Sequence, residues 1–214
     1  ESSGILGRGF RCGFLGMLHM EIITERLRRE FTIEIIITSP SISYEITWPD
    51  GSIENVYAAN RFPEYGEKVS VREPWILGQI ILPGEYMGNI LTLLYEHEAS
   101  VIDTELFSDG RTLLAIEMPL RELMRGFFDR LKNASSGYAS LSYEIAEMRS
   151  ATVTKLDVLV AEEIVPAFSR VVGMMRADTE AKQIVDRLYD ALPRQQFVMK
   201  IQAKVMGKII ATKK

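Results

Sequence analysis

The chain has 214 residues, of which 47% are hydrophobic and 25% charged, and its formal net charge at pH 7 is −4. These values are typical of a globular protein with its own core, and the acidic balance argues against a general nucleic-acid coat protein. The single cysteine, Cys12, excludes a disulfide framework and fits a reducing compartment. No apolar run approaches the ~20 residues that span a bilayer. Because the chain opens on Glu1 without a leader, we expect it to be a piece of a longer protein.

The sequence contains no motif for self-contained catalysis or metal binding. No Gly-x-x-x-x-Gly-Lys-Ser/Thr run is present, so no phosphate-cradling P-loop is expected. Two histidines far apart, His19 and His97, and one cysteine do not make a zinc site. Cys12 lies in an apolar stretch, which favours a buried, inert thiol over a Cys12–His19 nucleophile pair. We therefore expect no catalytic, cofactor-binding or metal-ligating residues in this chain.

Residues 1–38 are predicted to contain one amphipathic helix between two extended runs. The β-branched run over residues 33–38 predicts a buried strand. One helix with so few strands is an incomplete layer, so this segment is expected either to pack on the next domain or to begin midway through a domain, and the absence of an initiator Met favours the second. The helix is indicated by apolar residues at helical spacing, namely Met20, Ile23, Leu27 and Phe31.

Turn-forming residues dominate residues 39–74. Asp50-Gly51 predicts a hairpin between residues 43–47 and 53–57. The rest of this segment is typical of a linker between domains.

The clearest architecture lies in residues 75–149. Patterns of period 2 and 3.6 alternate there in the order strand, helix, strand, strand, helix, strand, which predicts a ferredoxin-like plait. The strands are expected over residues 75–82, 101–107, 112–118 and 139–145. The buried stripes of the helices are expected at Met87, Ile90, Leu91 and Leu94, and at Leu120, Leu123, Met124, Phe127, Phe128 and Leu131.

Residues 150–214 are predicted to form a third α+β unit with a basic face. Asp178 is expected to cap its helix, and a final alternating strand turns Lys200 and Lys204 outward, joined by Lys208 if the strand register holds past Gly207. Residues 151–214 hold 11 basic and 7 acidic side chains, whereas the remaining 150 residues hold 14 and 22. This imbalance favours a polyanionic partner at the C-terminal end. The alternative is a solvated lysine-rich face without a partner.

Several motifs, in the correct order, resemble one family. The run from Gly9 to Ile23, GFRCGFLGMLHMEII, resembles the signature of LepA, elongation factor four. The later matches are Arg72–Trp75, Phe127–Lys132, Gly137–Ser140, Lys155–Leu159, Val165–Ala167, Pro193–Phe197 and Gly207–Ala211.

The resemblance implies an α+β fragment of a translational GTPase whose N-terminal domain, absent here, binds GTP and Mg²⁺. It implies half a plait over residues 1–38, a linker with a hairpin over 39–74, a full plait over 75–149, and the start of a LepA-specific C-terminal domain over 150–214. The implied activity of the longer protein is ribosome-dependent GTP hydrolysis with back-translocation of tRNA.

The partners implied by the resemblance are ribosomal RNA and tRNA, without a small-molecule substrate. The implied location is the cytoplasm, and the resemblance allows peripheral association with the inner face of the cell membrane. Two alternatives stay open: a fragment of another translational GTPase, such as elongation factor G or the TypA type, and a plait that binds a small-molecule regulator. The candidate RNA contacts are Arg8, Arg11, Lys132, Ser136, Lys155, Arg194, Lys200, Lys204 and Lys208.

Overall fold

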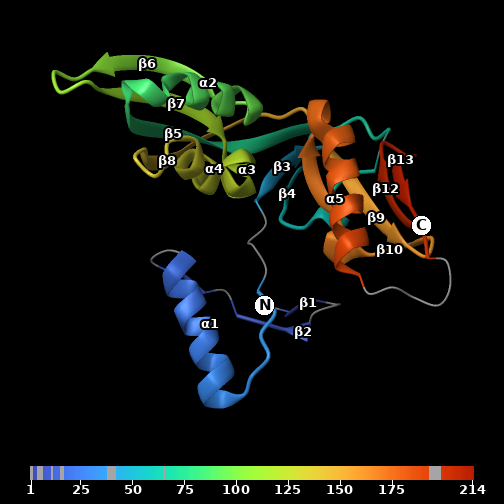
Figure 1. Cartoon of the computed structure of the whole chain (residues 1–214). Helices are drawn as coiled ribbons and strands as arrows, with labels where there is room; N and C mark the ends of the chain where they lie inside the picture. The colour runs from blue at the N-terminus through green and yellow to red at the C-terminus, as the bar shows by residue number, and fades with distance from the viewer. Residues whose placement is uncertain are drawn as a thin grey trace. The chain divides into compact units, whose positions relative to one another are not determined.

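The computed structural model describes residues 2–3, 7–10, 12–14, 17–37, 42–64, 66–192 and 199–214. The chain divides into two compact units, Glu1–Pro40 and Ser41–Lys214. Figure 1 shows the elements of each unit.

The first unit contains the expected helix but not the expected strand. Helix α1, Met17–Phe31, is supported by ion pairs one turn apart, such as Arg29 with Glu25 at 2.6 Å. Residues 32–37 have no regular structure and Ile36 is 73% exposed, so the prediction of a buried strand was wrong. A strand needs a hydrogen-bonded neighbour, and the described strands of this unit, β1 (Ser2–Ser3) and β2 (Gly7–Arg8), pair with each other. Cys12 is exposed rather than buried.

A six-stranded antiparallel sheet dominates the second unit. Its strand order is β4-β3-β5-β7-β6, and β8 pairs with the other edge of β5. The strands are β3 (Tyr44–Thr47), β4 (Ile53–Val56), β5 (Ser70–Pro83), β6 (Ser100–Leu106), β7 (Arg111–Pro119) and β8 (Ser140–Ser150).

Strands β5 to β8 and their helices form the predicted ferredoxin-like plait. The chain order β5-α2-β6-β7-α3-α4-β8 and the sheet order β8-β5-β7-β6 are those of this fold. The helices are α2 (Met87–Glu96), α3 (Leu120–Glu122) and α4 (Phe128–Ala134), with a π-helical turn, Leu123–Phe127, between the last two. The plait's core contains Ile76, Ile80, Leu82, Ile90, Leu93, Leu94, Leu114, Ile116, Met118, Leu123, Phe127, Leu131 and Ala139.

The predicted helix stripes were correct only in part. Leu91, Met124 and Phe128 are exposed, whereas Leu93 is buried. The prediction for the second helix is wrong at Met124 and Phe128 because Gly126 has φ +79. The helical path breaks at this residue, and the periodicity of buried positions starts again after it.

A five-stranded sheet with helix α5, Ala177–Ala191, forms the C-terminal domain. Its order is β10-β9-β12-β13, with β11 also paired to β9. Arg176 is the N-cap residue of α5 and makes no side-chain cap, so the prediction that Asp178 caps the helix was wrong. Asp178 lies in the first turn, where its charge still favours the helix dipole. The strands are β9 (Val153–Val160), β10 (Glu163–Ile164), β11 (Arg170–Gly173), β12 (Ile201–Val205) and β13 (Lys208–Lys213).

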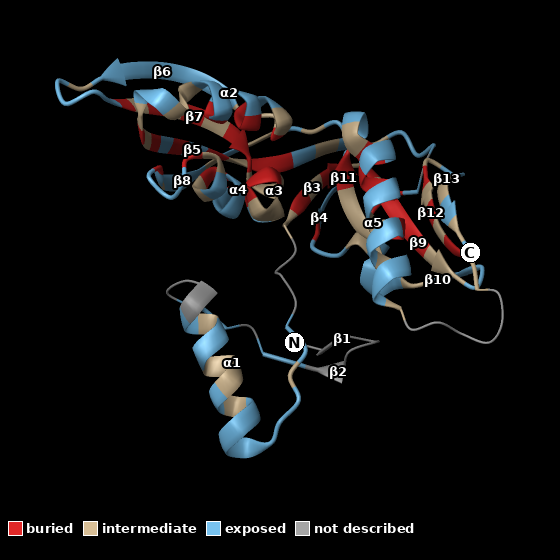
Figure 2. Cartoon of the chain, in the orientation of Figure 1, coloured by how far each residue is buried: buried red, intermediate tan, exposed pale blue. Residues whose placement is uncertain are grey.

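The hairpin predicted around Asp50-Gly51 is confirmed as β3–β4. It also joins the large sheet, because β3 pairs with the first residues of β5. The hairpin strands and residues that follow them form a separate small core, in which Tyr44, Ile46, Val56, Phe62 and Val153 are buried. Figure 2 shows buried segments in β3 and β4. Short 3₁₀ turns occur at Ala59–Arg61, Gly84–Tyr86, Pro166–Phe168 and Met174–Arg176.

Candidate nucleic-acid interface

The face of the C-terminal sheet opposite α5 carries basic side chains. Ile201, Ala203 and Val205 of β12 are buried against α5, and successive side chains of a strand point to opposite faces. Lys200 and Lys204 therefore share the other face, as their alternation predicts. Their neighbours on β9 include Asp157, which is the register partner of Lys204. We call this surface the open face, defined by Lys155, Asp157, Lys200, Gln202 and Lys204.

Lys208 does not continue the row of Lys200 and Lys204. The chain reverses at Met206 and Gly207, whose φ values are +49 and +75, and Lys208 becomes the register partner of Val205. Partners in register lie on the same face of a sheet, so Lys208 is on the side of Val205. The register does not hold past Gly207, so the condition for Lys208 to share the outward face is not met, because a two-residue hairpin replaces the continuous strand.

A cavity of about 470 Å³ opens beside Lys155 and Lys204. Lys155 Nζ lies 2.8 Å from Glu64 Oε1 and 3.4 Å from Asp157 Oδ2. Ser169 Oγ also donates to Asp157, at 2.8 Å. The hydrogen bond from Lys155 lowers the pKa of the Glu64 carboxyl. Lys155 is thus held by two carboxylates, whereas Lys204 makes no ion pair with any described residue.

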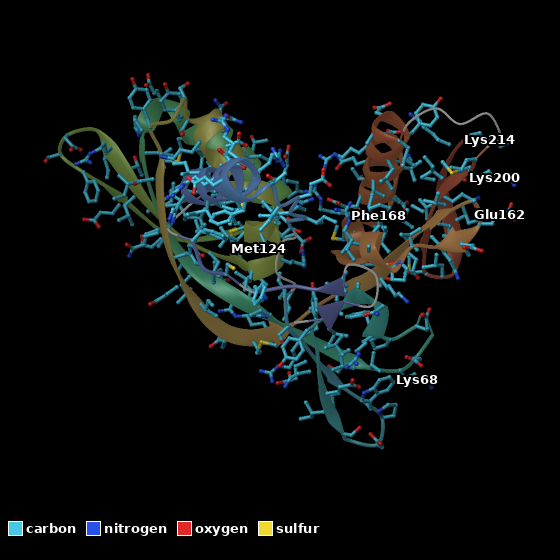
Figure 3. The ribbon with its side chains drawn as sticks, turned by 90° about the horizontal axis from the view of Figure 1, so that it is seen from below. Lys68, Met124, Glu162, Phe168, Lys200 and Lys214 are labelled. Atoms are coloured by element: carbon cyan, nitrogen blue, oxygen red, sulfur yellow. The ribbon has the colours of Figure 1, made fainter. Side chains whose placement is uncertain are left out.

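Lys200 lies at the other end of the open face. Its Nζ is 2.8 Å from Glu162 Oε1, and Figure 3 shows these two side chains together at one end of the domain. The Lys200 ammonium lowers the pKa of the Glu162 carboxyl through this hydrogen bond. The Lys200 side chain is 42% exposed and that of Glu162 is 70% exposed, so the ion pair is weak and Lys200 can exchange Glu162 for another anion.

The plait places Lys132 and Ser136 at the end of α4, away from the open face in sequence. Lys132 Nζ lies 3.4 Å from the Gly137 carbonyl oxygen and 5.6 Å from the centre of the Phe128 ring. Ser136 and Gly137 both have positive φ, +50 and +88, and end the helix. The exposed ring of Tyr138 stacks on Tyr86 with ring centres 6.0 Å apart.

Three predicted contact residues cannot be compared with the structure. Arg11 and Arg194 lie outside the described residues, as does the whole Pro193–Phe197 motif. Only the backbone of Arg8, in β2, is described.

Sequence reasoning missed a buried ionic network on the plait. Arg121, whose side chain is 8% exposed, contacts Glu98, lies 2.6 Å from Glu122 and places its Nε 2.9 Å from Glu73 Oε2. Burial acts to lower the pKa of Arg121, but the three glutamates hold it above its ordinary value. Burial raises the pKa of the Glu73 carboxyl to about 7, although Arg121 acts to lower it. The only sequence signal for this network was Glu73, a charged residue next to the apolar run that begins at Pro74.

His97 extends this network and is completely buried. Its Nε2 lies 3.0 Å from Arg130 Nη1, and because a guanidinium only donates, Nε2 is the acceptor. Nδ1 lies 3.2 Å from both the carbonyl oxygen and Oε2 of Glu122, and 3.5 Å from Arg125 Nη2. Arg125 contacts the same Glu122 carboxylate at 2.5 Å.

The described residues contain no cluster of three or more side chains suited to hold a metal ion. None of the described helices is long and apolar enough to cross a membrane.

Comparison with known proteins gives two family matches. Residues 70–180 match the family described as "Elongation factor G C-terminus", and residues 160–214 match "GTP-binding protein LepA C-terminus". Proteins named "Elongation factor 4" are similar over 99% of this chain: 43% identical in Acetivibrio thermocellus, 41% in Ruminiclostridium cellulolyticum and 42% in Fusobacterium nucleatum. The chain spans 35% of the length of these relatives.

The plait and the first match define a C-terminal domain of the elongation factor G type. The second match and the relatives go further: the chain belongs to the elongation factor 4 (LepA) family and corresponds to the C-terminal region of its members. This result disfavours a fragment of elongation factor G itself or of the TypA type.

Proposed function

We propose that this chain is the ribosome-docking part of a translational GTPase that acts on the position of tRNA, with back-translocation as the activity. The observation that carries the proposal is the 41–43% identity to Elongation factor 4 proteins over 99% of the chain. We call the longer protein the parent factor. GTP and Mg²⁺ are bound by other parts of that factor, because this sequence has no P-loop. Its proposed location is the cytoplasm, with peripheral contact to the inner membrane face as an additional expectation.

The proposed domain boundaries are those expected from the sequence. Residues 1–38 belong to one plait, residues 39–74 connect the domains, residues 75–149 form the second plait and residues 150–214 begin the C-terminal domain. The plait core and the α5 core are separate clusters of buried residues, which supports the last division. The hairpin β3–β4 makes the connection a structured one.

The proposed RNA contacts are made chiefly by the open face. Lys204 has no described ionic partner, and Lys200 has only one exposed partner, so both ammonium groups are available to phosphate oxygens. Lys155 contacts phosphate only if its ion pairs with Glu64 and Asp157 open. Lys132, Ser136, Lys208, Arg8, Arg11 and Arg194 remain proposed contacts at other positions.

The test is the affinity of the parent factor for ribosomes, measured against salt concentration. In the double variant Lys200→Gln, Lys204→Gln, we expect weaker binding at low salt. Each phosphate contact contributes about 0.7 to 0.9 to the slope of log affinity against log salt, so the slope should flatten by roughly 1.4 to 1.8. An unchanged slope would identify the open face as a solvated lysine face.

A matched control removes two positive charges from the opposite side of the same domain. Lys182 and Arg187 are exposed on α5, and their change to Gln alters the net charge equally. We expect this control to keep the salt slope of the parent factor. An equal loss in both variants would indicate a general effect of net charge rather than local contacts.

A further inference from the structure

Charged residues of the plait and of the C-terminal domain meet at a buried junction. We infer that the plait and the C-terminal domain are locked into a single rigid body by arginine–glutamate contacts, with the Glu180 carboxylate at the centre. This inference concerns the mechanics of the chain and does not depend on the proposed contacts with RNA.

Glu180 is the first element of this lock. It lies in the first turn of α5 and is 5% exposed. Its Oε1 lies 2.5 Å from Arg125 Nη1 of the plait, and its Oε2 lies 3.1 Å from Arg170 Nη2 of β11. One carboxylate therefore holds two guanidinium groups, one from each domain. Burial keeps the pKa of Arg170 below its ordinary value, and the nearby positive charges of Arg187 and Arg125 act in the same direction.

The C-terminal end of α2 is the second element. The last carbonyl groups of a helix lack partners within the helix and carry the negative end of its dipole. The Glu96 carbonyl oxygen accepts a hydrogen bond from Arg125 Nη2 at 3.3 Å, and it also accepts one from Arg176 Nη1. Arg176 precedes α5 directly, so the C-terminal domain supplies a cap to a helix of the plait.

The third element is steric. A Cβ atom placed on Gly173, the last residue of β11, would lie 2.6 Å from Glu98 Oε1 and 3.4 Å from Arg121 Nη1. The Glu98 side chain can move away only by breaking its hydrogen bonds with Arg121, which donates to both of its carboxylate oxygens. A side chain at residue 173 would therefore displace the Glu98 carboxylate and disturb its contact with Arg121.

These contacts oppose the motion that two adjoining domains otherwise have. The side chains of Arg121, Glu122 and Glu180 are each less than 10% exposed, so their charges are largely removed from water. Separating the domains would take the Glu180 carboxylate away from Arg125, whereas Arg170 and Glu180 would stay together in the C-terminal domain. A displacement that breaks the Arg125–Glu180 contact but keeps both groups buried would leave charges without partners, which is unfavourable, so the junction resists bending.

The experiment measures the distance between two spin labels, one on each domain. In the full chain with Cys12→Ser, cysteines replace the exposed residues Glu105 of β6 and Lys182 of α5. A rigid junction predicts one narrow distance distribution. Glu180→Gln is expected to broaden it, and to speed amide exchange in β11 and at the end of α2 by about tenfold or more. An equally narrow distribution and unchanged exchange in Glu180→Gln would overturn the inference, as would a broad distribution in the unmodified junction.

Two further variants separate this role from ordinary destabilisation. Glu162→Gln makes the same chemical change in the same domain at an exposed ion pair, and it should leave the distribution narrow. If Glu180→Gln does not fold, Arg176→Gln removes a single contact between the domains and should broaden the distribution to a smaller extent. A narrow distribution in Arg176→Gln would then count against the inference.

Discussion

Arg125 of the plait places Nη1 2.5 Å from Oε1 of Glu180, although 55 residues separate the two in sequence. Arg125 lies where the helical path breaks, with φ −81 and ψ +27, and the next residue, Gly126, has φ +79. The ion pair therefore depends on an irregular backbone that helical periodicity does not reveal. The same break removes Phe128 from the apolar stripe that begins at Leu123.

Gly126 provides the most direct test of this break. A Cβ atom at residue 126 would meet nothing within 4 Å, so Gly126→Ala introduces backbone strain without a clash. A non-glycine residue in the left-handed region costs about 1–2 kcal/mol, and we expect that loss in the free energy of unfolding. Urea denaturation followed by tryptophan fluorescence measures it.

Gly88→Ala is the matched control. Gly88 lies on the exposed side of α2, has no positive φ and also has open space around its Cβ position. Alanine exceeds glycine in helix propensity by about 1 kcal/mol, so this variant should be more stable than the unmodified chain. If both variants shift stability in the same direction, backbone strain at Gly126 is not the cause.

The two adjacent phenylalanines Phe127 and Phe128 give a second prediction. Phe127 is fully buried in the plait core, whereas Phe128 is 47% exposed. Phe127→Ala should cost about 3–5 kcal/mol of unfolding free energy. Phe128→Ala should cost about 1 kcal/mol or less, mainly through the lost contact with the Lys132 ammonium. Thermal or urea unfolding of both variants measures the difference, and equal losses would contradict the assigned burial.

The sequence predicts the plait well because each element has a strong local pattern. Its alternating strands and the hairpin at Asp50-Gly51 agree with the structure. The strand expected over residues 33–38 does not form, because β-branched residues favour a strand only where a partner is available. Pattern alone describes one segment at a time and cannot supply that partner.

The candidate site was predictable only where it depends on alternation. The common face of Lys200 and Lys204 follows from the period of two in a strand. The contacts of Lys155 with Glu64 and of Arg125 with Glu180 join residues far apart in sequence, so no local spacing indicates them. Buried charges were unexpected for the same reason, because their partners come from other elements.

The lack of a P-loop gives a third prediction. We expect the isolated chain neither to bind nor to hydrolyse GTP, since its sequence has no loop that could cradle the phosphates. Isothermal titration calorimetry with GTP and Mg²⁺ is the measurement, with a P-loop GTPase as the positive control. Micromolar affinity for GTP would contradict the prediction and would mean that residues outside a P-loop bind the phosphates.

Glu73 predicts a specific dependence of stability on pH. Burial raises the pKa of its carboxyl from 4.5 to about 7, in spite of the neighbouring Arg121 guanidinium. Between these pH values the folded chain keeps a proton that the unfolded chain has released. The contribution of Glu73 to stability is therefore complete below pH 4.5 and is lost as the pH rises to about 7. The loss amounts to about 3 kcal/mol.

The variant Glu73→Gln isolates this contribution, because glutamine has a similar shape and does not titrate. Burial acts to raise the pKa of Glu122, but its contacts with His97 and two arginines lower it, so its contribution to stability grows with pH. Glu122 is present in both the variant and the unmodified chain, so its contribution cancels in the difference. From pH 5 to pH 8, the unfolding free energy of Glu73→Gln should therefore rise relative to that of the unmodified chain by up to about 3 kcal/mol. Glu54→Gln, at an exposed position in β4, is the control and should give a constant difference. A constant difference for Glu73→Gln as well would mean that Glu73 titrates alike in the folded and unfolded chain.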